Sequence, residues 1–316
     1  MSRLFTLLLI LLTPLPALAI QYPPATVEMT LKPVSEHVYY AQGKAGIATD
    51  NQGFISNAVA IVTGEGVVVV DALGSPSLAA LFLEKLREIS PEPVIQVIVT
   101  HYHADHIYGL QVFKEQGAEI IAPAGYDAYL DSPAAAERLR ERQDSLAPWV
   151  NEETRLVLPD RVLDKSLTLS VGGVELDITY LGAAHSDGDL SVLVRPDQVL
   201  ISGDIIFEGR LPFTGGADTA HWLAVLEGLD KQGVKALIPG HGPAAENPAE
   251  AVRLTLDYLR FLRQQMAAAV EEMTPFDEVY ATIDWSRFSR LPAFAETNRR
   301  NAYGVYLSLE REMLDR

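Results

Sequence analysis

The sequence predicts an α/β protein in which two central sheets lie between outer helices, a four-layer αββα sandwich. Strand-like runs of β-branched residues occur in two separate sets, and segments with helical spacing of apolar residues accompany both sets. The continuous apolar runs VVVV and VIQVIV are typical of strands covered on both faces. No low-complexity linker and no repeat of solenoid period interrupts the chain.

The first half of the chain predicts five strands and two regular helices. A helix is expected over 78–89, with Pro76 near its start, and another should end at Gly117. The charged stretch 126–153 is expected to be helical and to form an insertion over one edge. The strands are expected in HVYYAQG, NAVAIVT, GVVVVDA, VIQVIVT and AEIIAP.

The second half predicts two hairpins and then mostly helix. LTLSVGGVELDITYLG should turn at Gly172–Gly173, and LSVLVRPDQVLISGD at Pro196–Asp197. A helix over 218–231 leads to a short strand in VKALIPGHG. A long amphipathic helix is expected from Pro248 to about Met273, and the C-terminal NAYGVYLSLEREMLDR is expected to be helical as well.

The N-terminus has the features of a secretory signal peptide. Arg3 precedes an apolar stretch at 4–12, and ALA at 17–19 fits a cleavage site. We expect residues 1–19 to be removed and the protein to be periplasmic, with no stable membrane span afterwards. The alternative is an uncleaved anchor, although Pro14 and Pro16 break the apolar stretch.

Composition limits the partners and the chemistry. The net charge of −17 argues against a nucleic acid partner, because so acidic a chain repels phosphate backbones. The 316 residues include no cysteine, so no thiolate can act as nucleophile or ligand. Any metal must be held by histidine and carboxylate, and we expect a small-molecule substrate. The oligomeric state is left open.

Seven histidines and aspartates follow the ends of predicted strands. The ends of strands in α/β proteins gather at one sheet edge, where binding sites form, so these side chains are expected to meet there. Neutral imidazoles and carboxylates are ligands for Zn²⁺. As alternatives, Asp204 alone could cap a turn, and the 101–106 stretch could be a polar loop. His37 and His221 lack ligand-like neighbours and are expected to be structural. The seven are His101, His103, Asp105, His106, His185, Asp204 and His241.

These motifs resemble the metallo-β-lactamase superfamily. THYHADH matches its H-x-H-x-D-H signature, and VVVVDAL, GAAHSDGD, SGD and PGHG resemble its other motifs in order, over roughly residues 35–245. The resemblance implies an αββα fold with a two-metal site. It implies a catalytic domain over 20–245 and a C-terminal helical segment, 246–316, packed on the same domain.

The resemblance also implies roles for single residues. A first zinc would be held by His101, His103 and His185, and a second by Asp105, His106 and His241. Asp204 would bridge the two ions, and Asp71 would support the ligands without touching metal.

The motifs indicate the branch of the superfamily less specifically than the superfamily itself. The absence of cysteine removes the β-lactamase branches with a cysteine ligand, and Asp204 in SGD is similar to glyoxalase II and its relatives. HIYGL, AHSDGDLSVLV and GDIIFEGRLPF are similar to exported hydrolases of sulfur oxidation or quinoprotein relay systems. Tyr108 stands where many relatives have glycine and should narrow the pocket.

The expected function is that of an exported binuclear zinc hydrolase. A metal-bridging hydroxide would attack the carbonyl of a thioester, lactone, ester or β-lactam, with Asp105 orienting it. Arg210, Phe54 and Tyr108 are candidate substrate contacts, although a solvated charge is the simpler interpretation of Arg210. Iron or manganese could replace zinc. The alternatives are a mononuclear iron enzyme that oxygenates sulfur, phosphodiester cleavage, and a non-catalytic periplasmic metal-binding or relay component.

Overall fold

The computed structural model describes residues 22–229 and 233–315. The expected signal peptide, residues 1–19, lies outside the described part. Within that part, no helix has the length and apolar character needed to cross a membrane.

The first sheet has seven strands in sequence order. The first four strands pair antiparallel, and the fourth to the seventh pair parallel. The strands are β1 (Leu31–Pro33), β2 (Val38–Ala41), β3 (Ala58–Val62), β4 (Val67–Val70), β5 (Val94–Ile98), β6 (Glu119–Pro123) and β7 (Arg161–Leu163).

The second sheet has five strands in the order β12-β11-β10-β9-β8. The strands are β8 (Leu167–Val171), β9 (Val174–Gly182), β10 (Asp189–Val194), β11 (Val199–Ile201) and β12 (Ala236–Ile238). Both predicted hairpins are present: β8 pairs antiparallel with β9, and β10 with β11. Gly172 and Gly173 both have positive φ at the first turn, a conformation that glycine adopts without strain.

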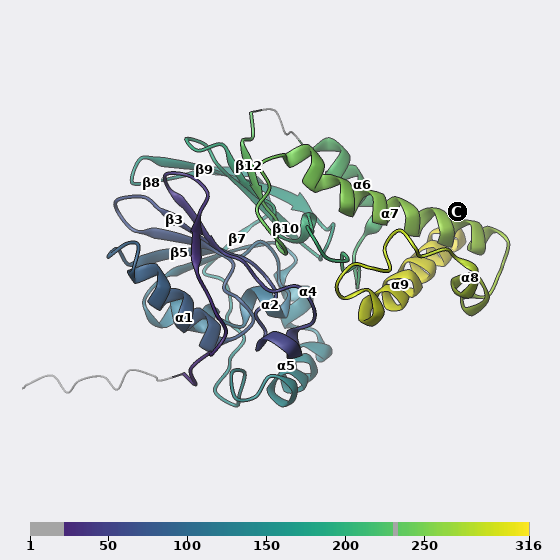
Figure 1. Ribbon diagram of the computed structural model, residues 1–316, viewed down its shortest axis with the longest axis horizontal. Helices are drawn as coiled ribbons and strands as arrows, with labels where there is room; N and C mark the ends of the chain where they lie inside the picture. The colour runs from purple at the N-terminus through teal and green to yellow at the C-terminus, as the bar shows by residue number, and fades with distance from the viewer. Residues whose placement is uncertain (1–21, 230–232, 316) are drawn as a thin grey trace, which may run out of the picture.

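Two sheets and two outer helical layers pack together through apolar side chains, which confirms the predicted four-layer sandwich. Val70 and Ile98 of the first sheet share one buried cluster with Ile178 and Val192 of the second, so the two sheets pack face to face. Helices cover the outer faces, as Figure 1 shows for α1 on one side and α6 and α7 on the other. The covering helices are α1 (Pro76–Arg87), α3 (Leu110–Glu115), α6 (Thr219–Gly228) and the first half of α7 (Pro248–Glu271).

The insertion after β6 is helical in part, as expected. It contains α4 (Tyr126–Leu130) and α5 (Pro133–Ser145). Tyr129 and Leu146 from this stretch join the core beneath the first sheet. The insertion therefore packs on the domain close to the loop that follows β5.

The C-terminal helices form a cluster of their own at the far end of α7. Leu262 and Met266 of α7 pack against Phe276 of α8 (Phe276–Thr282) and Val305 of α9 (Phe294–Leu314). Figure 1 shows α8 and α9 beside this half of α7, projecting away from the sheets. Leu211, which precedes all three helices in the sequence, is fully buried in the same cluster.

Candidate metal centre

The predicted ligands do meet at one edge of the sandwich. His101 and His103 follow β5, and His103 immediately precedes the short helix α2 (Ala104–Ile107), which carries Asp105 and His106. From the second sheet, His185 follows β9, and Asp204 lies in a 3-10 turn, η2 (Gly203–Ile205), after β11. His241 follows β12. Both sheets thus deliver side chains to one place.

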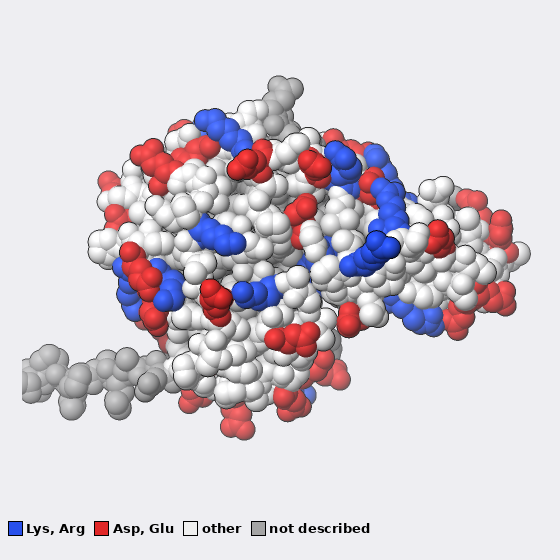
Figure 2. Space-filling view, in the orientation of Figure 1, with Lys and Arg blue, Asp and Glu red and all other residues white. Residues whose placement is uncertain are grey.

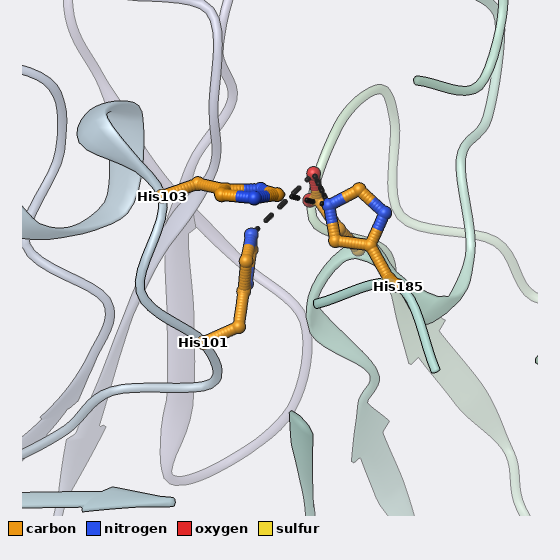
Figure 3. Close-up of side chains that lie close together, drawn as sticks. His101, His103 and His185 are labelled. Carbon is orange, nitrogen blue, oxygen red and sulfur yellow. Dashed lines mark hydrogen bonds and ion pairs between the residues drawn. The ribbon is translucent and has the colours of Figure 1, made fainter. Parts of the chain in front are cut away.

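Three histidines and Asp204 form the first ligand group. Their ligand atoms all lie within 4.8 Å of one another. His185 Nε2 lies 3.0 Å from His103 Nδ1 and 3.3 Å from Asp204 Oδ2, and His101 Nε2 lies 3.8 Å from the same oxygen. Figure 3 shows the rings of His101, His103 and His185 converging on one point from the two sheets.

The second ligand group consists of Asp105, His106 and His241, again within 4.8 Å. Asp105 Oδ2 lies 3.2 Å from His241 Nε2 and 3.6 Å from His106 Nε2. Asp204 joins the two groups, because its Oδ1 is 3.3 Å from His106 Nε2 and its Oδ2 is 3.2 Å from His241 Nε2. A single carboxylate therefore faces four histidines and both groups.

The buried polar atoms of these groups fit metal ions. His101 Nε2, His106 Nε2 and Asp204 Oδ1 are buried and have no hydrogen-bond partner. Buried polar atoms without partners carry a large desolvation cost, which a coordinated cation would remove. The donor set of imidazole nitrogen and carboxylate oxygen suits Zn²⁺ and also iron or manganese.

Hydrogen bonds on the far side of each ring fix the ligand orientation. The Nδ1–H of His106 donates to Asp71 Oδ2 at 2.9 Å, and that of His241 donates to Ile55 O at 2.8 Å. Asp71 also accepts from Thr100 N and Oγ1, and Thr100 Oγ1 lies 3.0 Å from His101 Nδ1. Asp71 thus touches a ligand from behind, which is the supporting geometry expected of it.

Burial and charge move the histidine pKa values in opposite directions in the two groups. Burial lowers the pKa of His101 well below its usual value and that of His185 to about 3. Burial also opposes protonation of His106, but Asp204, Asp71 and Asp105 outweigh it and raise its pKa well above the usual value. The pKa of His241 is raised as well, because Asp204 and Asp105 outweigh burial and the Arg210 charge.

Asp105 and Asp204 are the carboxylates within this cluster. Burial opposes their ionisation, but the surrounding histidines hold both pKa values below the usual range. The two carboxylates therefore stay ionised near neutral pH and are available to balance cations.

Several residues that shape the centre were not singled out from the sequence. Asp189 accepts from Ala184 N and Ser186 N at 3.0 Å each, which holds the loop of His185. Asn57 donates to Pro239 O at 2.7 Å and Gly242 O at 2.9 Å and holds the loop of His241. The AHSDGD motif contained a signal for Asp189, but nothing near Asn57 indicated its role.

Close backbone approaches explain two glycines of the motifs. A Cβ on Gly240 would lie 1.9 Å from Asp204 Oδ1, so a side chain there would displace the shared carboxylate. Gly203 has a φ of +52°, and a Cβ there would lie 2.6 Å from Thr100 Oγ1. Gly240 of PGHG therefore makes room for Asp204, and Gly203 of SGD makes room for Thr100.

The three candidate substrate contacts lie in different surroundings. Tyr108 lines a pocket together with Asp105 and Arg142. Phe54 is only 1% exposed and packs in the core. Its contact with substrate stays a prediction. Arg210 is not a solvated surface charge, because it is only 7% exposed, and its Nη1 lies 3.2 Å from His241 Nδ1. His37 and His221 lie outside both ligand groups, bonded to Asp197 and Leu181 O.

Comparison with known proteins agrees with this geometry. Residues 51–241 match the model of the metallo-beta-lactamase superfamily. The chain is 26% identical over 221 residues to a metallo-beta-lactamase type 2 of Elizabethkingia meningoseptica, covering 68% of this chain and 80% of that protein. It is 30% identical over 193 residues to the acyl-coenzyme A thioesterase MBLAC2 of Gallus gallus, covering 55% of this chain and 68% of that protein.

Among solved structures, a sec-alkylsulfatase, Pisa1 from Pseudomonas sp., superposes with a TM-score of 0.68 at 19% identity. The match covers 89% of this chain and 50% of the alkylsulfatase, and at this low identity it shows a shared fold alone. With its family model spanning most of the domain, this chain belongs to the metallo-beta-lactamase superfamily of metal-dependent hydrolases.

Proposed function

We propose that the protein is an exported binuclear zinc hydrolase that cleaves a carbonyl substrate such as a thioester, lactone, ester or β-lactam. The observation that carries the proposal is the pair of ligand groups that share Asp204. His101, His103 and His185 would hold one ion, and Asp105, His106 and His241 the other. Seven ligand side chains are too many for one tetrahedral ion.

When bound, zinc ions at this centre would lower the pKa of a water molecule and polarise the substrate carbonyl. The chain's own residues then have distinct tasks. Asp105 is partly exposed, with 22% of its side chain accessible, and would orient the attacking water. Asp204 is almost fully buried and would balance the charge of both ions.

Arg210 would bind an anionic group of the substrate. Among the described residues it forms no ion pair with any carboxylate, and its Nε is buried without a hydrogen-bond partner. Burial lowers the pKa of its guanidinium, yet arginine stays charged near neutral pH. A buried cation without an ion-pair partner is costly, so an anion from the substrate would stabilise it.

Cleavage of a sulfate ester is the second candidate function, and Arg210 is the observation that favours it. A guanidinium binds a sulfate group as well as a carboxylate, with two parallel hydrogen bonds. The similarity in fold to an alkylsulfatase makes this substrate class worth testing beside the carbonyl substrates.

Acidic side chains lie over both the sandwich and the helical projection on the face drawn in Figure 2, with basic side chains among them. Together with the net charge of −17, this distribution supports a small-molecule substrate rather than a nucleic acid.

A hydrolysis screen of the zinc-loaded protein tests the function. We expect turnover of at least one of a thioester, a chromogenic β-lactam, a lactone and a primary alkyl sulfate, and none by the metal-free protein. Elemental analysis should saturate at two zinc ions per chain, and His106→Ala or His241→Ala should reduce it to one. Saturation with one iron would instead support sulfur oxygenation, and two bound zinc ions without any turnover would support a relay component.

Export is tested separately, by fractionation and N-terminal sequencing of the protein from a bacterial host. We expect the periplasmic protein to begin at Ile20, since Arg3, the apolar stretch and the ALA at 17–19 have the features of a signal peptide. A cytoplasmic protein that begins at Met1 would contradict this part of the proposal.

A further inference from the structure

The segment from Phe207 to Thr214 lies between the metal centre and the C-terminal helices. The Phe207 ring stacks on His241, with 5.1 Å between centroids and 5° between planes. The Phe213 ring lies 6.3 Å from the ring of His103. With Arg210 beside His241, the segment presents three side chains to the two ligand groups.

The backbone of this segment is held from the opposite side by the C-terminal helices. Phe207 N donates to Thr255 Oγ1 of α7 at 3.0 Å. Leu211 N donates to Pro292 O, just before α9, at 3.1 Å. The Asn301 side chain of α9 adds two bonds: its Nδ2 donates to Pro212 O at 2.7 Å, and its Oδ1 accepts from Thr214 N at 3.1 Å.

The chemistry of these bonds requires an amide at position 301. The side chain must accept from an N–H and donate to a carbonyl at the same time, and Nδ2 also donates to Tyr258 Oη at 3.0 Å. Asn301 is fully buried, so any replacement leaves polar backbone atoms of the segment without partners. An aspartate could accept but not donate, and a serine is too short to reach both backbone atoms.

We infer that Asn301 is a positioning residue, which holds the 207–214 segment so that Arg210 and Phe213 face the metal centre. This inference rests on the proposed function, because it assigns part of that site to the C-terminal helices. The bonds of Asn301 to Pro212 and Thr214 lie two to four residues from Arg210, close enough to set where its guanidinium points. Misplacing a substrate-binding group by about 1 Å can reduce activity substantially.

Asn298 provides a matched control one turn earlier on the same helix. It is also fully buried and also bonds to Tyr258, whose Oη donates to Asn298 Oδ1 at 2.9 Å. Its Nδ2 donates to Tyr280 Oη at 3.0 Å, so its side-chain bonds stay within the helical cluster. A purely structural role for the buried amides predicts similar consequences for both residues.

The test compares Asn301→Ser with Asn298→Ser in the zinc-loaded protein. Hydrogen exchange measured by mass spectrometry follows the peptide that covers 207–216, without any need for a substrate. We expect exchange there to become about tenfold faster in Asn301→Ser and to stay within twofold in Asn298→Ser. With a chromogenic β-lactam or thioester, KM should rise about tenfold in Asn301→Ser while kcat changes less than threefold and the zinc content stays the same.

Equal acceleration of exchange by the two variants would overturn the inference, as would unchanged exchange in Asn301→Ser. Faster exchange with unchanged KM would also overturn it, because the anchored segment would then have no bearing on substrate. If Asn301→Ser does not fold, Asn301→Asp and Asn298→Asp replace the pair, since aspartate keeps the size and the acceptor. If the wild type turns over no substrate of the hydrolysis screen, the proposed function alone is rejected, and exchange still decides whether Asn301 anchors the segment.

Discussion

The two ligand groups lie side by side yet differ in what surrounds them. Trp222 packs against His185 of the first group at 4.9 Å between centroids, whereas Phe207 lies between the groups, 5.7 Å from His185 and 5.1 Å from His241. The second group is surrounded by charge, with Asp71 behind His106 and Arg210 beside His241. Burial therefore decides the pKa values of the first group, and neighbouring carboxylates decide those of the second.

This difference indicates that the two ligand groups have different roles within one centre. Histidines with lowered pKa values are neutral over a wide pH range, so they are ready to coordinate metal and form the more robust site. The second group contains the partly exposed Asp105 and lies beside Arg210, so it is the side from which substrate and water would enter. We expect the first group to secure the metal and the second group to adjust reactivity.

Asp204→Asn removes the carboxylate that the two groups share, so it should erase the difference between them. Its two oxygens face His106, His185 and His241 at 3.2–3.3 Å, and no other described carboxylate touches both groups. We expect weaker metal binding at both positions and a loss of activity of about 10³-fold or more. Metal titration with measurement of kcat checks this, and full retention of one metal would show that Asp204 serves a single group.

Asp105→Asn should separate the groups instead. The substitution keeps the size of the side chain but removes the charge beside His106 and His241. We expect kcat to fall about 10²-fold, while the first group keeps its metal and the fold survives. The measurement is a pH–rate profile with metal content for both proteins. A variant with wild-type kcat and two bound metals would mean that Asp105 has no catalytic role.

The features of this centre that depend on residues close together in the sequence could be predicted, and those that depend on residues far apart could not. Most of the strands, both hairpins and the strand-end ligands could be predicted because β-branched runs, glycine turns and polar residues after them are local patterns. The three-residue strands β1 and β7 were not predicted. Asn57 and Asn301 could not be predicted, because each acts through hydrogen bonds to backbone atoms distant in sequence, Pro239 O and Pro212 O. A lone asparagine, whether just before a strand like Asn57 or within a helix like Asn301, carries no local pattern that reveals such a partner.

The burial of Arg210 could not be predicted from the sequence either. A charged residue in GDIIFEGRLPF is expected at the surface, and only the packing of the 207–214 segment under the C-terminal helices buries it. The resemblance of the motifs supplied the ligand set but not this neighbour. Tertiary packing therefore places a positive charge beside His241 that the sequence pattern did not predict, and this charge lowers the pKa of His241.

Asp71→Asn should weaken the second group more than the first, because Asp71 bonds directly to His106 but reaches His101 only through Thr100, and by less than the loss of a ligand. Asp71 holds His106 through Nδ1, and a lost bond of this kind costs about 10–100-fold in metal affinity. The matched control is Asp197→Asn, which breaks a similar bond between Asp197 and His37 Nδ1 at 2.7 Å, outside both groups. Zinc affinities from competition with a chelator check both variants. Equal weakening by the control would point to a general loss of stability.

The mildest way to test the comparison is to lower the pH. The raised pKa values of His106 and His241 mean that protons compete with metal there at higher pH than at His101 and His185, whose pKa values are lowered. As pH falls from 8 to 4, bound zinc should therefore drop from two ions to one before the last ion leaves. Equilibrium dialysis at each pH, followed by elemental analysis, measures this. To assign the steps, His241→Ala should abolish the first release and leave the second where it was. Simultaneous release of both ions would mean that burial and charge do not separate the groups, because Asp204 would then couple them into a single titrating unit.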